Sequence, residues 1–291
     1  PTIIRKIDNS KDHTMSDYSW KEMMAVVFSR EIKDTDKITS GAHTEIFFAA
    51  TMLAQKTHAP NLKLQLGGSV TLCQVTDIEV PELPKTSTGY DLIRYAESVH
   101  DHPDTYLFYG APGGKNYYKE GSEYRDVNHF WFADKFFVGG ILVDKWGNTN
   151  MIGLVGKDGK MSFRGPGTIG INDIAVGVRD TYVFLTAHDK SRLVEKVDYI
   201  SHPGKKVCRE NEFYGGGPKW IVTPKCIFDF DPDTLEARLA QVFPGVTVDD
   251  VKANTGFEVK TAKKVENVLP PSKQELDALR NEVDKTGVLR H

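Results

Sequence analysis

A strand, a helix and a second strand follow one another closely near the N-terminus, and this order constrains the fold most. Residues 36–40 have the pattern of a short strand, residues 44–56 that of a helix capped by Thr44, and residues 61–66 that of a second strand. Two strands joined through one helix nearly always form a parallel pair with a right-handed crossover. The pattern therefore predicts an α/β fold.

Strand signals later in the chain predict that the sheet also contains antiparallel pairs. Residues 136–143 form an apolar run, residues 145–148 supply a turn, and residues 151–155 are expected to be its hairpin partner. Further strands are expected at 181–186, 194–200, 220–223, 226–230 and 235–243, the last three as an antiparallel meander. Helices are expected to begin after Ser19, Thr247 and Ser272, because each of these residues is followed by an acidic residue at a distance of three positions. The expected fold is an open mixed β-sheet flanked by helices.

Composition narrows the class of protein. The chain has 291 residues and a net charge of −3, so it lacks the cationic excess that attracts nucleic acid. No apolar run approaches the ~18 residues that a membrane span requires. Residues 1–20 lack the apolar segment of a signal peptide, and Cys73, Cys208 and Cys226 are too far apart for a CxxC metal site. We expect a cytoplasmic protein.

Residues 85–132 differ in composition from the rest of the chain. Tyrosines recur there among glycines and mixed charges, including Tyr106, Tyr109, Tyr117, Tyr118 and Tyr124. Tyrosine buries aromatic area at a small entropic cost and keeps a polar tip, which suits a surface for a ligand or a partner. We expect a single domain over residues 1–291 with this stretch as an insertion or lid; a loop packed on its own core is an equal alternative.

Gly165, Gly167 and Gly170 spell GxGxxG, the pattern of a dinucleotide-binding loop. The context disfavours that function, because residues 157–164 are charged and turn-like and residues 171–178 contain too many β-branched residues for a long helix. Two other interpretations remain. The glycines could serve turns with positive φ, or their backbone N–H groups could cradle the oxygen of a thioester carbonyl.

Several short motifs, in order, resemble the β subunit of family I CoA-transferases. They are residues 137–144 (FVGGILVD), 147–150 (GNTN), 164–167 (RGPG), 188–190 (HDK), 196–200 (KVDYI) and 254–257 (NTGF). The resemblance extends from about residue 20 to residue 284. It implies a CoA-transferase-like fold, an α-type partner subunit in a heterotetramer, and an active site between the two subunits.

The resemblance also implies a catabolic enzyme that acts on an acyl-CoA, with coenzyme A as part of the substrate and no other cofactor. It marks positions close to the substrate and to coenzyme A, which are Gly67, Gly68, Gly139, Gly140, Asn148, Gly165, Gly167 and Gly170.

The family's nucleophile is missing from the expected position. In the transferases a glutamate at the end of the strand that corresponds to residues 61–66 attacks the acyl-CoA and then carries coenzyme A as a thioester. Leu66 stands at that position, and the nearest carboxylates beyond it are Asp77 and Glu79. The resemblance therefore supports the CoA-thioester scaffold and leaves the nucleophile vacant.

Other residues are candidates for replacement chemistry. His43 and Glu45 lie just past the end of the first strand of the parallel unit, where open α/β sheets bind ligands, and could act as a base and its helper. Glu45 could equally be an acid that the helix dipole favours in a first turn, and His43 a residue without chemistry. Cys73 is expected to be an inert core thiol, and His188-Asp189 a ligand contact or a solvated turn. No spacing in the chain predicts a metal site.

These observations favour an enzyme subunit that acts on an acyl-CoA thioester. Without the glutamate, the expected reaction is hydrolysis or cleavage of a C–C bond. The alternatives are a true CoA-transferase whose nucleophile is placed differently and a non-catalytic scaffold subunit.

Overall fold

The computed structural model describes residues 17–40, 45–66, 70–73, 98–99, 133–168, 170–213 and 215–291. Its centre is a ten-stranded sheet with the order β15-β14-β13-β12-β10-β5-β1-β2-β3-β4. The strands are β1 Lys37–Ser40, β2 Lys63–Leu66, β3 Val70–Cys73, β4 Ser98–Val99, β5 Lys135–Gly139, β10 Asp180–Phe184, β12 Pro218–Val222, β13 Cys226–Phe230, β14 Ala237–Val242 and β15 Lys260–Asn267.

The sheet is mixed, as the sequence predicts. Strands β2, β1, β5, β10 and β12 are parallel neighbours. The pairs β2–β3, β3–β4, β12–β13 and β13–β14 are antiparallel, and β14–β15 is parallel. The expected parallel unit and the expected meander are both confirmed.

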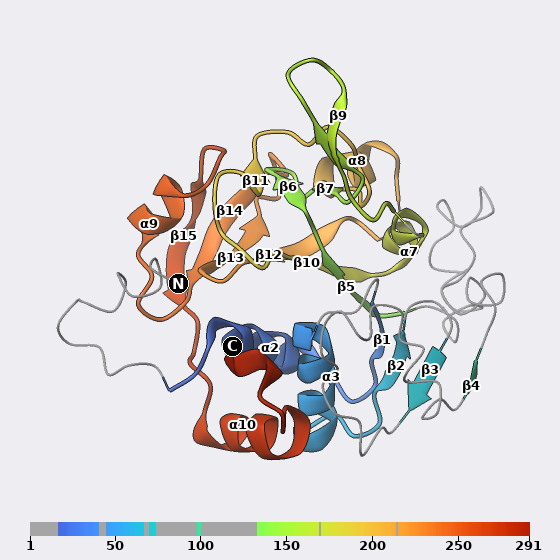
Figure 1. The fold of residues 1–291 in the computed structure, drawn as a ribbon, viewed down its shortest axis with the longest axis vertical. Helices are drawn as coiled ribbons and strands as arrows, with labels where there is room; N and C mark the ends of the chain where they lie inside the picture. Colours follow the sequence, from blue (N-terminus) through green and yellow to red (C-terminus); the bar gives the residue numbers. More distant parts are fainter. Residues whose placement is uncertain are drawn as a thin grey trace.

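Helices cover both faces of this sheet. Figure 1 shows α2 (Trp20–Glu31), α3 (Glu45–Thr57) and α10 (Lys273–Ala278) on one side, and α8 (Lys205–Glu210) and α9 (Val248–Ala253) on the other. The short helix α7 (Ile171–Gly177), the π-helical turn η2 (Leu279–Val283) and the 3₁₀ turn η3 (Val288–Arg290) complete the described helices. No described helix has both the length and the apolar character that a membrane span requires.

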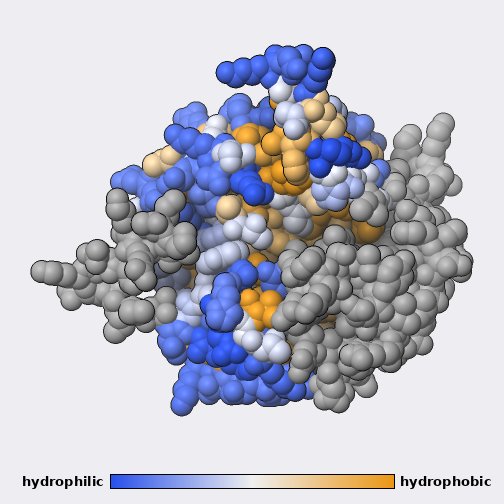
Figure 2. Space-filling view, in the orientation of Figure 1, coloured by the Kyte–Doolittle hydropathy of each residue, from blue (hydrophilic) through white to orange (hydrophobic). Residues whose placement is uncertain are grey.

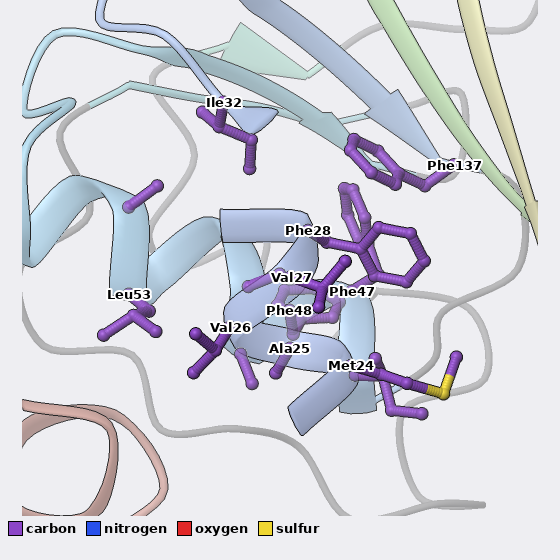
Figure 3. Packing of buried hydrophobic residues seen from close by; sticks show 14 of the residues in the cluster. Met24, Ala25, Val26, Val27, Phe28, Ile32, Phe47, Phe48, Leu53 and Phe137 are labelled. Atoms are coloured by element: carbon purple, nitrogen blue, oxygen red, sulfur yellow. The ribbon is translucent and has the colours of Figure 1, made fainter. Parts of the chain in front are cut away.

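Successive side chains of β5 point to opposite faces of the sheet and therefore belong to two different hydrophobic cores. Phe137 faces the cluster formed with α2 and α3, whereas Phe136 and Val138 belong to the cluster on the opposite face. In Figure 3 the rings of Phe28 and Phe47 converge on Phe137. The ring centroids of Phe28 and Phe137 lie 5.2 Å apart, edge to face, which is a favoured aromatic geometry. The first two helices are thereby fixed against the centre of the sheet.

Two small sheets lie beside the large one. Strands β11 (Leu193–Val194), β6 (Leu142–Asp144) and β7 (Thr149–Asn150) form one, and β8 (Gly153–Val155) and β9 (Met161–Arg164) form the other, a two-stranded hairpin. This β8–β9 hairpin projects from the body of the molecule (Figure 1).

Three expectations about strands are wrong. The apolar run 136–143 is not one strand, because the chain leaves the large sheet at Gly140 and continues as β6, whose antiparallel partner is β7. Residues 153–155 pair instead with β9, so the segment 157–164 contains a strand and is not only a turn. The strand expected at 194–200 ends at Val194, because β6, its partner among the described strands, ends at the paired residue Asp144.

Gly140 explains the first of these errors. A Cβ atom there would lie 2.7 Å from the Cγ2 atom of Thr149, so only glycine permits the approach of β5 to β7. The Gly140 N–H donates to the Phe184 carbonyl, whereas the next N–H, of Ile141, donates to the Asn150 carbonyl. The chain changes its hydrogen-bond partner within one residue.

The insertion or lid expected at 85–132 lies almost entirely outside the described residues. Only Ser98–Val99 of that stretch is described, as β4 paired with β3. The insertion and the single-domain boundary of 1–291 remain predictions.

The three helix starts expected after Ser19, Thr247 and Ser272 are confirmed, and reciprocal capping boxes form at Ser19 and Ser272. Ser19 accepts a hydrogen bond from the Glu22 N–H, and its hydroxyl also donates to the Leu289 carbonyl near the C-terminus. Ser272 forms the equivalent box at α10 and is exposed. Ser19 thus joins the two ends of the described chain.

We expect Ser19→Ala to lower the free energy of unfolding by about 2 kcal/mol and Ser272→Ala by about 1 kcal/mol, because only the first substitution also leaves a carbonyl without its donor. Urea denaturation of the two variants and the wild type measures both values. Equal losses would show that the contact between Ser19 and Leu289 adds nothing to stability.

Candidate functional site

The carboxyl ends of four parallel strands meet at one edge of the large sheet. Ser40 at the end of β1 is in register with Leu66 at the end of β2, and Gly139 at the end of β5 is in register with Phe184 at the end of β10. Ligands of open α/β sheets bind outside this edge. We call it the carboxyl edge and take it as the candidate active site.

Several sequence-predicted residues belong to this edge by their place in the chain. His43, Gly67 and Gly68 directly follow β1 and β2 and lie outside the described residues, so their roles remain predictions. Leu66 is the last residue of β2, at the position where the family resemblance implies a glutamate. Cys73 ends β3, which runs antiparallel to β2, so it lies away from the carboxyl edge.

Glycines from two distant parts of the sequence come together at the end of β5. Gly139 ends that strand, and Gly140 and Ile141 follow it. A Cβ atom on Gly165 would lie 2.6 Å from the Ile141 Cδ1 atom and 2.4 Å from the Met151 carbonyl oxygen. We call residues 165–170 the glycine loop; the structure packs its first residue against the segment that leaves the carboxyl edge.

The expected oxyanion cradle is not formed by the first part of this loop. The Gly165 N–H donates to the Ile152 carbonyl at 2.7 Å, and the Gly167 N–H donates to the Met151 carbonyl at 3.0 Å. Pro166 between them has no N–H. Gly167 has φ +91°, so the interpretation as a positive-φ turn applies here.

The second part of the loop differs from the first in its described hydrogen bonds. Within the described part of the chain, the N–H groups of Thr168 and Gly170 have no acceptor. Gly170 has φ +77° and precedes α7, which has only seven residues. The strand before the loop, β9, pairs with β8 outside the large sheet, so this GxGxxG lacks the strand–turn–helix setting of a dinucleotide fold.

Asn148 has a structural role. Its Nδ2 atom donates to Asp144 Oδ2 at 3.0 Å, and its Oδ1 atom accepts from the Gly204 N–H at 2.7 Å. Both Asn148 and Asp144 are buried, and burial raises the pKa of the Asp144 carboxyl. Asn148 therefore fixes the turn between β6 and β7 with both ends of its amide, and its expected contact with the substrate remains untested.

Glu45 begins α3 and is largely buried. Its carboxylate lies 3.3 Å from the Lys21 Nζ atom of α2. A carboxylate in the first turn is favoured by the helix dipole, and this one also has a cationic partner. The position supports the structural interpretation of Glu45, while its catalytic role remains a prediction.

His188 is not a solvated residue, and the alternative of a ligand contact at His188-Asp189 stays a prediction. His188 is buried, its Nδ1 atom lies 2.8 Å from the Thr223 hydroxyl, and its Nε2 atom lies 3.2 Å from the Thr255 hydroxyl. Burial lowers the pKa of His188 to about 4. The neutral ring thus holds the end of β12 against α9.

Arg164 begins the RGPG motif but is not among the site residues that the sequence predicts, and the structure places it next to the glycine loop. Arg164 is exposed, and its Nη1 atom donates to the Ile152 carbonyl at 2.7 Å. Its Nη2 atom would lie 3.4 Å from a Cβ atom on Gly167. In the sequence, the feature that could have indicated this residue is a cationic side chain directly before the first glycine of the GxGxxG motif.

Apolar surface and charge are separated on the β8–β9 hairpin. Figure 2 shows a hydrophilic tip at the top of the view and an apolar area below it. Met161 and Phe163 of β9 are 42% and 50% exposed, which is high for side chains of their size. Among the described residues, no group of three or more His, Cys, Asp or Glu side chains is arranged to hold a metal ion.

Comparison with known proteins identifies relatives of this chain. A family model described as coenzyme A transferase matches residues 114–254. The relatives include B subunits of CoA-transferases. The one from the glutaconate CoA-transferase of Acidaminococcus fermentans is 29% identical over 274 residues, which cover 92% of this chain and 94% of that protein. The crystal structure of glutaconate coenzyme A-transferase from the same organism has a TM-score of 0.77 at 24% identity, covering 95% of this chain and 98% of that chain.

Two further matches have other activities in their names. The IpdB subunit of the cholesterol ring-cleaving hydrolase of Mycobacterium tuberculosis is 25% identical over 268 residues, covering 90% of this chain and 94% of that protein. The decarboxylase AibA/AibB has a TM-score of 0.71 at 21% identity, covers 93% of this chain and 97% of that chain, and shows the shared fold alone. The chain is thus a relative of CoA-transferase B subunits and has their fold.

His188 predicts a pH dependence of stability. Because its folded pKa of about 4 lies below the ordinary value of 6.5, the unfolded chain binds more protons as the pH falls between these values. The free energy of unfolding therefore decreases as the pH falls through this window. At pH 4.5 the loss from His188 is on the order of 2 kcal/mol. Urea midpoints at pH 7 and pH 4.5 should differ less in His188→Gln than in the wild type; an unchanged difference would contradict the assignment.

Proposed function

We propose that this relative of CoA-transferase B subunits is one subunit of a heteromeric enzyme that acts on an acyl-CoA thioester at the carboxyl edge. The observation that carries the proposal is the packing of the glycine loop against the end of β5, where Gly165 contacts Ile141. This packing places a tight, glycine-lined surface at the edge where α/β sheets bind ligands. The similarity to CoA-transferase B subunits over nine-tenths of the chain supports a thioester as the ligand.

The second subunit is proposed to be of the A type. Relatives of this chain are named as B subunits, and related structures are named by two subunits, AibA/AibB and IpdAB. An A-type chain would close the carboxyl edge from the other side and exclude water from the thioester. We propose a cytoplasmic heterotetramer of two A and two B subunits, with coenzyme A present only as part of the substrate.

Leu66 determines which nucleophile can attack the thioester, because this side chain cannot do so itself. Transfer through an enzyme-bound thioester needs a carboxylate that attacks the thioester carbonyl, and a leucine side chain has no lone pair with which to attack. We propose that water or a carboxylate of the partner subunit attacks instead. In hydrolysis, the water oxygen bonds to the carbonyl carbon, its proton passes to a base, and the C–S bond breaks to release the coenzyme A thiol.

His43 and Glu45 are the proposed helpers on this chain. Both adjoin the end of β1 in the sequence, and Glu45 begins α3 there. Cleavage of a C–C bond next to the thioester is the second reaction proposed, because a ring-cleaving hydrolase subunit is among the relatives. Both reactions use the thioester carbonyl as the group that accepts negative charge.

We expect no coenzyme A adduct on this chain during turnover. The complex with its A-type partner is incubated with acyl-CoA, and the intact masses of both subunits are measured. Product without an adduct supports hydrolysis or C–C cleavage, and an adduct on the partner supports transfer with the nucleophile across the interface. An adduct on this chain would overturn the proposed role of Leu66. Leu66→Glu should gain a hydroxylamine-sensitive adduct, whereas the control Leu66→Met should not.

We expect Gly167→Ala to lower kcat/KM by about tenfold or more, because a strained loop would misplace the groups that position the substrate at the carboxyl edge. Alanine at φ +91° costs roughly 1 to 2 kcal/mol of strain and meets only the Arg164 guanidinium. Gly245→Ala is the matched control, since Gly245 has φ +80° and open space around its missing Cβ. The two variants should lose similar stability in urea. Equal activities would show that the glycine loop is only a turn.

A further inference from the structure

We propose that Arg164 binds an anionic oxygen group of the substrate, either a carboxylate at the far end of the acyl group or a phosphate of coenzyme A. The inference rests on the proposed function, because it assigns a ligand contact to the same carboxyl edge. It goes beyond that function by naming the residue and the chemistry of the group that is recognised.

The location of Arg164 is the first argument. It is the last residue of β9, in register with Gly153 of β8, and it directly precedes the glycine loop. Gly165 next to it contacts Ile141, which follows the end of β5. A short series of contacts therefore connects the guanidinium to the carboxyl edge.

The geometry of the side chain is the second argument. One guanidinium nitrogen, Nη1, donates to the Ile152 carbonyl, which restricts the rotation of a long and otherwise flexible side chain. The other terminal nitrogen lies over Gly167, where a Cβ atom would meet it at 3.4 Å. The glycine thus leaves room for the flat guanidinium at the loop, and the fork is oriented before a ligand arrives.

The unpaired charge is the third argument. Arg30, Arg179, Arg238 and Arg280 each form an ion pair with a carboxylate, whereas Arg164, like Arg192, Arg209 and Arg290, forms none with a described residue. Among these four, Arg164 is the one that adjoins the glycine loop. The single hydrogen bond of its side chain to a described residue leaves most of its N–H donors free. A guanidinium fork with free N–H groups matches the spacing of carboxylate and phosphate oxygens and binds either in a bidentate manner.

A structural role accounts poorly for this residue. Arg164 is exposed on β9, and the only hydrogen bond of its side chain to a described residue is to a nearby backbone carbonyl. Exposed contacts of this kind contribute little to stability. Arg164→Gln is therefore expected to fold and assemble normally, which makes it a clean test of binding.

The test measures affinity in the complex of this chain with its A-type partner, by titration calorimetry. The probes are glutaryl-CoA, acetyl-CoA and glutaryl-pantetheine, which differ in the acyl carboxylate and in the phosphates. Lys160→Gln is the matched control, because Lys160 adjoins the same strand, is exposed and has no ion pair with a described residue. We expect Arg164→Gln to weaken glutaryl-CoA binding about tenfold or more and Lys160→Gln to leave it near the wild-type value.

The probes distinguish the two sources of the anion. Weaker binding of glutaryl-CoA and glutaryl-pantetheine with unchanged acetyl-CoA assigns Arg164 to the acyl carboxylate. Weaker binding of both CoA thioesters with unchanged glutaryl-pantetheine assigns it to a phosphate. Arg164→Lys should restore part of the lost affinity in either case, since it keeps the charge and loses the fork.

Three results would overturn the inference. Equal affinities of Arg164→Gln and Lys160→Gln for all probes would show that Arg164 binds no substrate group. Loss of the A-type partner from Arg164→Gln in size-exclusion chromatography would make Arg164 a subunit contact. A wild-type complex that binds none of the CoA thioesters would overturn the proposed function itself and this inference with it.

Discussion

The register between the parallel strands is the constraint on which the rest of the structure depends. It is fixed at the amino end of the sheet, where the buried ammonium of Lys135 pairs with the buried carboxylate of Asp36. Next to this pair, the Lys37 N–H donates to the Asp134 carboxylate, and the Asp134 N–H donates to the Lys37 carbonyl. A slip of one residue would leave two buried charges apart, at a cost of several kcal/mol. The carboxyl edge is thus set by contacts at the opposite end of the strands.

Patterns among neighbouring residues were sufficient to predict the main helices and strands. They were insufficient to predict the contacts of the candidate site. The capping box at Ser19 and the strand–helix–strand unit follow from residues within a few positions of one another, so the sequence predicts them. The break at Gly140, the engaged amide of Asn148 and the burial of His188 depend on segments 9 to 67 residues away. The same holds for the Gly167 N–H, whose acceptor, the Met151 carbonyl, is known only when the loop is placed.

The fold separates the residues that form its core from those at the carboxyl edge. Phe28, Phe137 and Tyr182 pack at the middle of the sheet, with ring centroids of Phe137 and Tyr182 4.9 Å apart. Leu66 and Gly139, by contrast, are the last residues of their strands. A substitution at the end of a strand can change the available chemistry while the packed centre stays the same. This separation explains how proteins named transferase, hydrolase and decarboxylase share one fold.

The exposed position of Arg164 avoids the free-energy cost of burying an unpaired guanidinium. A guanidinium placed directly on the carboxyl edge would be dehydrated by the covering subunit whether or not an anion were present, and an unpaired buried charge is costly. On the exposed β8–β9 hairpin it stays hydrated until a ligand anion replaces its water. The bond to the Ile152 carbonyl meanwhile keeps the fork over Gly167, so little side-chain entropy is lost on binding. If Arg164 binds an anion as proposed, an exposed and oriented cation next to the covered edge would give selectivity for anionic substrates without destabilising the free subunit.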